Sequence, residues 1–143
     1  MKFPMDLTFH HLGLAVRRPE AAKSFLSAQG YEIGSEVYDA EQNVNLILCR
    51  HSTEPDIEII WPGKGTGPVD GMIKRHASGL VYHTCYTTHD LGETLRAIER
   101  AGLDCVCVSP PKVASLFGGD KVSFYSLVGI GLIEILEQAA KPR

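Results

Sequence analysis

The sequence predicts an α/β protein built from two βαβββ modules. Two segments, HLGLAVRRPEAAKSFLSAQGYEI from His11 and HTCYTTHDLGETLRAIERAGLDC from His83, each indicate a strand, an amphipathic helix and a glycine that ends the helix. His11 and His83 are 72 residues apart, as are Gly30 and Gly102. Self-similarity at a fixed spacing indicates a repeated structural unit.

The two predicted helices have matching start signals and apolar stripes. Asp90, followed by Glu93 three residues later, predicts a capping box. Its counterpart in the first half is Arg18, followed by Pro19 at the favoured first helical position. Apolar residues recur at helical spacing in both segments: Ala21, Ala22, Phe25 and Leu26 in the first, and Leu91, Leu95, Ile98 and Ala101 in the second.

Three strand candidates follow each helix. They are YEIGSEVY, NVNLILCR and DIEIIW in the first half, and LDCVCVS, KVSFYSL and GLIEILE in the second. A long loop, PPKVASLFGGD, separates two strands of the second half, and a Gly-rich connector, PGKGTGPVDGMIKRHASG, joins the halves. We expect one short helix in this connector, near Val69 to Lys74.

The composition is that of an ordinary globular protein, with 44% hydrophobic and 22% charged residues. A net charge of −3 gives no indication of a nucleic-acid surface. No apolar run approaches the ~20 residues of a membrane span, and the start MKFPMDLTFHH lacks the apolar core of a signal peptide. We therefore expect a cytoplasmic protein that binds neither nucleic acid nor membrane.

The four cysteines lie in apolar, strand-like runs, and no two of them form a C-x-x-C pair. We predict that they are small core residues in a reducing compartment. They are Cys49, Cys85, Cys105 and Cys107.

Two glutamates interrupt apolar strands at corresponding places. Glu58 lies in DIEIIWP and Glu134 in GLIEILE, each on the last strand of its half. An ionised carboxylate on an apolar surface is costly unless it is paired or binds a metal. The first strand of each half contributes a histidine, His11 or His83, so the repeat supplies two imidazoles and two carboxylates.

Strand alternation indicates which way the histidines point. His11, Gly13 and Ala15 share one face of their strand, and His83 shares a face with Cys85. Because the helices need the other, more apolar face, we expect the histidines to point away from them. The small neighbouring residues would leave room for a bound molecule.

His11, Glu58, His83 and Glu134 are therefore predicted to bind one divalent metal ion. Two imidazoles and two carboxylates suit zinc, nickel, cobalt, manganese or iron. A six-coordinate ion held by four such ligands keeps two positions for substrate oxygens, an arrangement that stabilises an enolate beside a carbonyl. Each residue has an ordinary alternative, as a hydrogen-bonded strand histidine or as a glutamate that faces solvent from an edge strand. Their equivalent positions in the two halves favour the metal site.

The same strings resemble the vicinal oxygen chelate superfamily, which includes glyoxalase I, methylmalonyl-CoA epimerase, extradiol dioxygenases and bleomycin-type resistance proteins. The likeness extends from about Phe9 to Glu137 and is strongest to methylmalonyl-CoA epimerase. HHLGLAV, IEIIWP, YHTCY and GLIEILE resemble that family's four ligand-bearing strands, and SPPKVASLFGGDKVSFY resembles its glycine-bearing hairpin. The resemblance places the metal ligands at His11, at Glu58 (where the family usually has Gln or Glu), at His83 and at Glu134.

The resemblance implies a single vicinal-oxygen-chelate domain over residues 1–143. Module 1 would span about 9–62, the connector 63–78 and module 2 about 79–137. The two modules would form a curved, partly closed mixed sheet with the helices on its outer face.

The resemblance also implies a metal-dependent epimerase, isomerase or glyoxalase-type lyase. Its reaction would begin with proton abstraction next to a carbonyl, on a small carbonyl compound or an acyl thioester such as a CoA ester. Glu134 or Glu58 would be both metal ligand and catalytic base. We also expect a homodimer, and the sequence leaves open whether the site closes within one chain or across the dimer.

One position departs from the epimerase pattern. The epimerase has a glutamate base shortly after an EQ-G-V stretch, and here EQNVNLIL places Leu46 at that position. A leucine cannot take a proton, so an epimerase mechanism with a base on each face of the substrate does not fit. In bacterial glyoxalase I a metal-bound glutamate is the base, and Leu46 would be no obstacle to that mechanism.

Two other functions remain open. A non-catalytic binding or resistance protein of the same fold typically lacks the full ligand set, and an iron-dependent oxygenase usually uses two histidines and one carboxylate. Lys112 and Lys121 flank the glycine loop and would either bind a charged part of the substrate or be ordinary solvated lysines.

Overall fold

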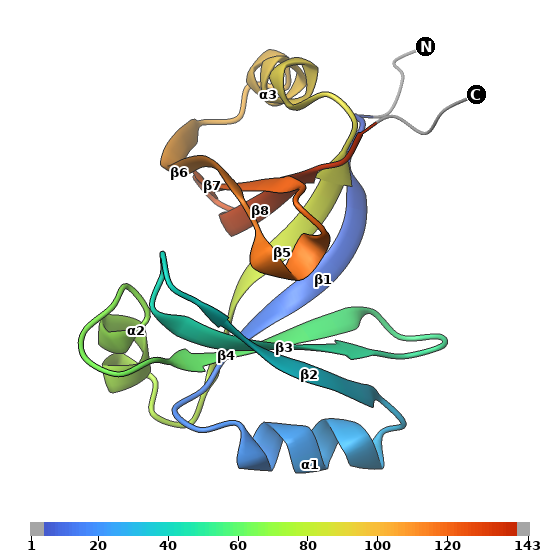
Figure 1. Cartoon of the computed structure of the whole chain (residues 1–143). Coiled ribbons are helices and arrows are strands. Elements are labelled where there is room, and N and C mark those ends of the chain that lie inside the picture. The colour runs from blue at the N-terminus through green and yellow to red at the C-terminus, as the bar shows by residue number, and fades with distance from the viewer. Residues whose placement is uncertain (1–4, 140–143) are drawn as a thin grey trace. The chain divides into compact units, whose positions relative to one another are not determined.

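The computed structural model describes residues 5–139 and confirms an α/β fold of two βαβββ modules (Figure 1). The expectation that the chain has no apolar leader rests partly on residues 1–4, which lie outside this range. The elements in chain order are β1 (Thr8–Ala15), α1 (Glu20–Ala28), β2 (Glu32–Asp39), β3 (Val44–Arg50), β4 (Asp56–Pro62), α2 (Asp70–Arg75), β5 (Leu80–Thr88), α3 (Leu91–Arg100), β6 (Cys105–Val113), a 3-10 turn (Ser115–Phe117), β7 (Lys121–Leu127) and β8 (Gly131–Glu137).

The chain divides into two compact units, and each contains most of one module. Of the described residues, the first unit contains His11–Tyr82, and the second contains residues 5–10 together with residues 83–139. Both boundaries fall inside strands, so β1 and β5 each continue from one unit into the other. The single domain and the predicted bounds of its two modules and connector stay predictions.

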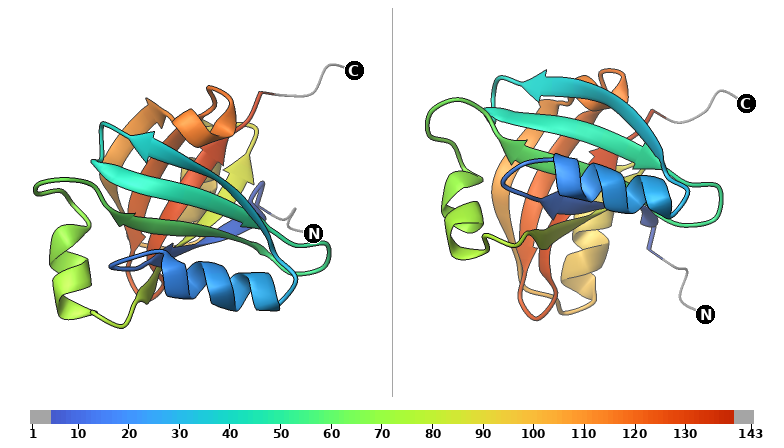
Figure 2. Two further views of the ribbon diagram at one scale, coloured as in Figure 1. Left: turned by 60° about the horizontal axis from the view of Figure 1, so that its bottom comes forward. Right: turned by 90° about the horizontal axis from the view of Figure 1, so that it is seen from below.

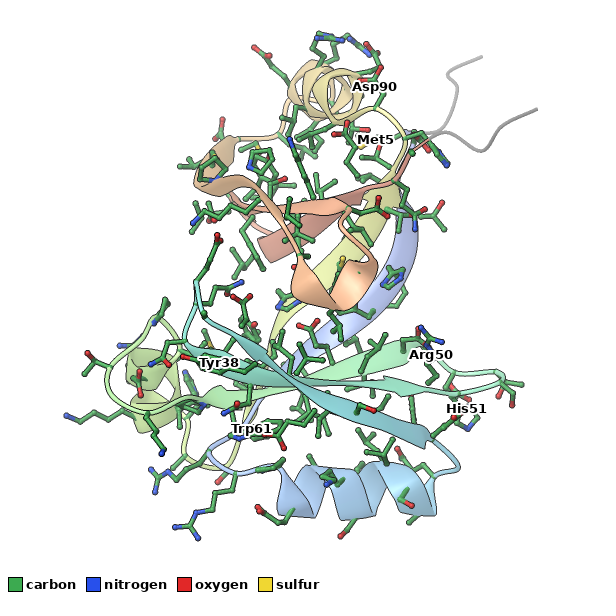
Figure 3. The ribbon with its side chains drawn as sticks, viewed as in Figure 1. Met5, Tyr38, Arg50, His51, Trp61 and Asp90 are labelled. Carbon is green, nitrogen blue, oxygen red and sulfur yellow. The ribbon has the colours of Figure 1, made fainter. Side chains whose placement is uncertain are left out.

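The first unit has a four-stranded mixed sheet in the order β2-β3-β4-β1. β1 and β4 are parallel, and the other two pairs are antiparallel. Seen from below in Figure 2, α1 lies across these strands. Its buried Leu26 packs with Ile47, Cys49 and Ile59, and Trp61 also lies on the α1 side of the sheet (Figure 3).

The second unit repeats this arrangement, in the order β5-β8-β7-β6. β5 and β8 are parallel, and the β6–β7 and β7–β8 pairs are antiparallel. Ile98 of α3 packs against Tyr125, Ile133 and Ile135, and Met5 contributes to the same core beside α3 (Figure 3). Each sheet therefore uses one face to pack against its own helix.

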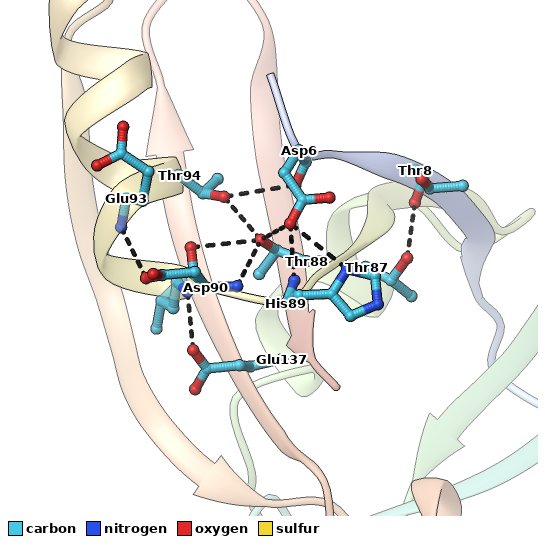
Figure 4. Close-up of polar contacts among 10 residues, drawn as sticks. Asp6, Thr8, Thr87, Thr88, His89, Asp90, Glu93, Thr94 and Glu137 are labelled. Carbon is cyan, nitrogen blue, oxygen red and sulfur yellow. Dashed lines mark hydrogen bonds and ion pairs between the residues drawn. The ribbon is translucent and has the colours of Figure 1, made fainter. Parts of the chain in front are cut away.

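The start of α3 agrees only in part with the predicted capping box (Figure 4). The Asp90 carboxylate accepts a hydrogen bond from the Glu93 backbone N–H at 3.0 Å, as an N-cap residue should. The Glu93 carboxylate instead contacts Arg96 and Arg100 further along the helix. Glu137 of β8 accepts from the backbone N–H of Leu91 at 2.7 Å and so satisfies another free donor of the first turn.

Several predicted boundaries were wrong by a few residues. α1 begins at Glu20, so Pro19 is its N-cap residue and not its first helical residue. β6 extends to Val113, so the first residues of the predicted long loop belong to a strand. Cys107 is exposed and not part of the core, while Cys49 and Cys85 are buried as predicted. Between residues 5 and 139, every helix is too short or too polar to span a lipid bilayer.

Candidate metal centre

Glu58 lies on the face of the first sheet that is turned away from α1. On β4, Ile57, Ile59 and Trp61 pack in the core under α1, and side chains alternate along a strand. Glu58 therefore points to the opposite face, where the residue is 4% exposed. We call this face of each sheet, opposite its helix and carrying the glutamate, the carboxylate face.

His11 lies on the same face, as predicted from the sequence. Gly13 of β1 is the register partner of Glu58, and His11 is two residues before Gly13 on the same side of the strand. The Nε2 atom of His11 is 3.7 Å from Oε2 of Glu58, and His11 is fully buried. Gly13 has no side chain between the two groups, so the imidazole and the carboxylate can approach each other.

His83 and Glu134 form the equivalent pair in the second unit. Cys85 of β5 is the register partner of Glu134, and His83 is two residues before Cys85. The Nε2 atom of His83 is 3.3 Å from Oε1 of Glu134, and the two side chains are almost completely buried. The ring of Phe124 contacts the His83 ring edge-on, at a centroid distance of 5.4 Å, and restricts its orientation.

The structure thus places the predicted ligands in two matching pairs, one in each unit. Each pair offers one imidazole nitrogen and one carboxylate oxygen, which are ligands that divalent first-row metals accept. A carboxylate buried among apolar strands needs a nearby positive charge, because burying an isolated charge is very costly. The donor types and their burial therefore fit a bound cation.

Leu46 lies on the carboxylate face and not under α1. On β3, Ile47 and Cys49 pack with α1, so Leu46 and Leu48 point to the opposite face. Leu48 is the cross-strand partner of Glu58, and Leu46 is the partner of Ile60. Leu46 is 8% exposed, so the position where an epimerase-like enzyme would have a base is part of an apolar surface.

Phe124 is a neighbour of the candidate ligand His83 that the sequence analysis did not identify. The register pairs Phe124 with Glu134, which places the aromatic ring on the carboxylate face beside His83. Alternation within KVSFYSL was a usable signal, because Val122 and Phe124 share the side of the strand that is opposite to the core residue Tyr125.

Fold and side chains together define a scaffold of two βαβββ modules, each with a buried histidine–glutamate pair whose donor atoms suit a metal ion. The chain belongs to the glyoxalase/bleomycin resistance protein/dioxygenase superfamily, whose family pattern matches residues 10–124. This membership confirms the resemblance to vicinal oxygen chelate proteins.

Relatives and solved structures agree with this assignment. An ethylmalonyl-CoA/methylmalonyl-CoA epimerase from Cereibacter sphaeroides is 26% identical over 110 residues, which cover 74% of this chain and 79% of that protein. The methylmalonyl-CoA epimerase of Mycobacterium tuberculosis superposes with a TM-score of 0.77 at 17% identity, covering 98% of this chain and 94% of that one. The Streptomyces coelicolor methylmalonyl-CoA epimerase in complex with 2-nitronate-propionyl-CoA has a TM-score of 0.73 at 21% identity, covering 94% and 99%. The two structural likenesses show a shared fold.

Proposed function

We propose that the two His–Glu pairs together bind one divalent metal ion, and that the protein is an enzyme of the glyoxalase or methylmalonyl-CoA epimerase type. The observation that carries this proposal is the equivalence of the pairs. In each unit a histidine of the first strand and a glutamate of the last strand meet on the face away from the helix. Histidines with a purely structural role have no reason to occupy equivalent positions in both units, each beside a glutamate. The repeat therefore favours a shared function as metal ligands.

A bound divalent ion would supply positive charge that stabilises negative charge developing on a substrate carbonyl oxygen. Glu134 or Glu58 would take a proton from the carbon next to that carbonyl. The edge contact of Phe124 would hold the His83 ring in place. The apolar side chains around Glu58 would exclude water from the substrate carbon.

Leu46 supports a base that is also a metal ligand. Its side chain lies on the same face as Glu58 and offers no group that can accept a proton. A reaction with a separate second base, as the epimerase pattern implies, would lack that base here. Removal of a proton from one carbon and its return to a neighbouring atom, as in an isomerisation, requires only one carboxylate, Glu134 or Glu58.

Names of the relatives support an acyl thioester as the substrate class. The Cereibacter relative is named for ethylmalonyl-CoA and methylmalonyl-CoA, and the Streptomyces structure contains a CoA derivative. We propose a CoA ester with an acidic hydrogen next to its thioester carbonyl as the substrate. The homodimer and the cytoplasmic location stay predictions, for which gel filtration and cell fractionation are the measurements.

The test is metal content measured by elemental analysis of purified protein and of single-residue variants. We expect about one divalent ion per chain, and we expect His11→Ala and His83→Ala each to lose it. His76→Ala is the control, because His76 is exposed at the end of α2. Independent binding by each pair, with half of the metal left in each variant, would contradict the single site. Iron together with oxygen consumption would favour an oxygenase, and no metal would favour a binding protein.

A further inference from the structure

Lys112 lies on the carboxylate face of the second unit. Cross-strand partners on this face form rows across the strands, and Lys112 is in the row next to that of Glu134. The register pairs Lys112 of β6 with Val122 of β7, and Val122 with Leu136 of β8. The neighbouring row on the same face runs from Ser109 through Phe124 to Glu134. Lys112 is therefore two strands and one row away from the candidate ligand.

Two irregularities in β6 bring Lys112 to this position. The register shifts once between Cys107 and Ser109 and again between Ser109 and Lys112, and each shift places one extra residue on β6. If the antiparallel pairing continued from Cys107–Tyr125 without these shifts, Lys112 would pair with Asp120 and not with Val122. The extra residues move it along the sheet by two positions, roughly 7 Å toward the row of Glu134. The first shift also turns Ser109 onto the carboxylate face, and bulges often re-aim side chains next to active sites.

The separation suits a contact through a substrate and not a direct ion pair. Two strand spacings and two residues along a strand put the α-carbons of Lys112 and Glu134 roughly 12 Å apart. A flexible four-carbon stem carries the lysine ammonium over about half of that distance. The ammonium can therefore reach an atom of a molecule that also contacts Glu134.

The surroundings of Lys112 leave its charge available. Its side chain is exposed, and within residues 5–139 it forms no ion pair. The surface beside it is apolar, since Val122 and Leu136 pack with Cys85, Ala114 and Phe117. The lysine ammonium thus lies at the rim of an apolar surface, and the Ser109 hydroxyl is one row away. These surroundings favour the binding of a mostly apolar ligand that carries one anionic group.

We propose that Lys112 is a substrate-binding residue that holds an oxyanion of the substrate, and this inference rests on the proposed function. The oxyanion is a carboxylate on the acyl group or a phosphate on the thioester carrier. Both present the same chemistry to an ammonium, and a substitution series separates them.

Lys121 provides a matched control in the same hairpin. It is also an exposed lysine of the β6–β7 ladder, but its register partners are Val113 and Glu137. Glu137 binds the start of α3, so Lys121 belongs to the helix side of the sheet. Lys112→Met and Lys121→Met remove the same charge, and only the first removes it from the carboxylate face.

The experiment measures the dissociation constants of methylmalonyl-CoA and propionyl-CoA by calorimetry for the metal-loaded wild type and both variants. Methylmalonyl-CoA has an acyl carboxylate that propionyl-CoA lacks, and the two share the same carrier. We expect Lys112→Met to weaken methylmalonyl-CoA binding about ten- to a hundredfold, the size expected for one charge-assisted hydrogen bond. We expect Lys121→Met to bind like wild type.

The pattern of dissociation constants shows which oxyanion Lys112 binds, or that it binds none. Weaker binding of methylmalonyl-CoA alone assigns Lys112 to an acyl carboxylate, and equal weakening of both ligands assigns it to a carrier phosphate. Wild-type affinity of Lys112→Met for both ligands, or equal losses in both variants, overturns the inference and leaves the proposed function intact. Failure of metal-loaded wild type to bind either thioester overturns this inference together with the proposed substrate class. Thermal melts and metal content show whether each variant is folded and loaded.

Discussion

Leu46 and Glu58 lie on the same face of the first sheet, two residues apart in the cross-strand ladder. Leu48 is the direct partner of Glu58, and Leu46 is the next side chain along β3 on that side. This relationship places an apolar group where an epimerase-like protein would have its base, close to a carboxylate that we propose as a metal ligand.

The substitution Leu46→Glu is expected to destabilise the protein without creating a strong epimerase. Leu46 is 8% exposed, so a charge at this position would be buried and would cost at least about 2 kcal/mol unless neutralised or paired. Leu46→Met is the control, because a volume-conserving apolar change costs less than about 1.5 kcal/mol. Urea unfolding, metal content and methylmalonyl-CoA turnover are measured on each variant. A large gain of turnover in Leu46→Glu, with metal retained, would mean that the site is an epimerase that lacks only its base.

The sequence predicted the elements well because α1 and α3 are amphipathic and strands such as β1 alternate. His11 could be placed away from α1 because Gly13 and Ala15 share its side of the strand, whereas Leu12 and Leu14 take the other. Every predicted strand is present, and β7 and β8 have the predicted bounds.

Two features could not be predicted from alternation. β3 is apolar on both faces, since Ile47 and Cys49 face α1 while Leu46 and Leu48 face the other way. The alternation of side chains along β3 therefore does not indicate which face packs against α1. Only the packing of α1 in the structure shows on which face Leu46 lies. The register shifts of β6 depend on pairing with β7, so the sequence alone could not separate Lys112 from Lys121.

Acid should remove a stabilising contact at Asp6. The backbone N–H of His89 donates to the Asp6 carboxylate at 2.9 Å and lowers the pKa of Asp6, and the Thr88 hydroxyl adds a second bond at 3.1 Å (Figure 4). A folded-state pKa below the unfolded value means that the contribution is present above about pH 4 and is lost as the pH falls through the lower folded value. The unfolding free energies of wild type and Asp6→Asn should therefore differ slightly at pH 7 and converge toward pH 2.

Equilibrium unfolding in urea at several pH values measures this effect. Asp104→Asn is the control, because Asp104 is also exposed and its carboxylate takes no part in the contacts with Thr88 and His89. A difference between wild type and Asp6→Asn that stays constant from pH 7 to pH 2 would show that the Asp6 charge contributes nothing and that the substitution acts through packing.

Removal of the metal should lower thermal stability. A ligand that binds only the folded state stabilises it by mass action, by about 4 kcal/mol when its free concentration is a thousand times the dissociation constant. We expect chelator-treated protein to melt at a lower temperature and to recover when a divalent ion is restored. His11→Ala and His83→Ala should melt at the same temperature with and without added metal. A wild-type melting temperature that does not change after complete metal removal would exclude the buried carboxylates as ligands.

The two glutamates should differ in their catalytic importance. The resemblance to epimerases allows either Gln or Glu at the position of Glu58. We therefore predict that the charge of Glu58 matters less than that of Glu134, and that Glu134 is the base. Glu134→Gln should slow the exchange of solvent deuterium into the carbon next to the thioester carbonyl by 10²–10⁴-fold, the usual size of a general-base contribution. Glu58→Gln is the matched change in the other pair and should retain most of the exchange. Mass spectrometry of the recovered substrate measures the deuterium, and elemental analysis confirms that both variants keep the metal. Loss of exchange in Glu58→Gln alone would move the base to Glu58, and wild-type rates in both metal-loaded variants would show that neither carboxylate removes the proton.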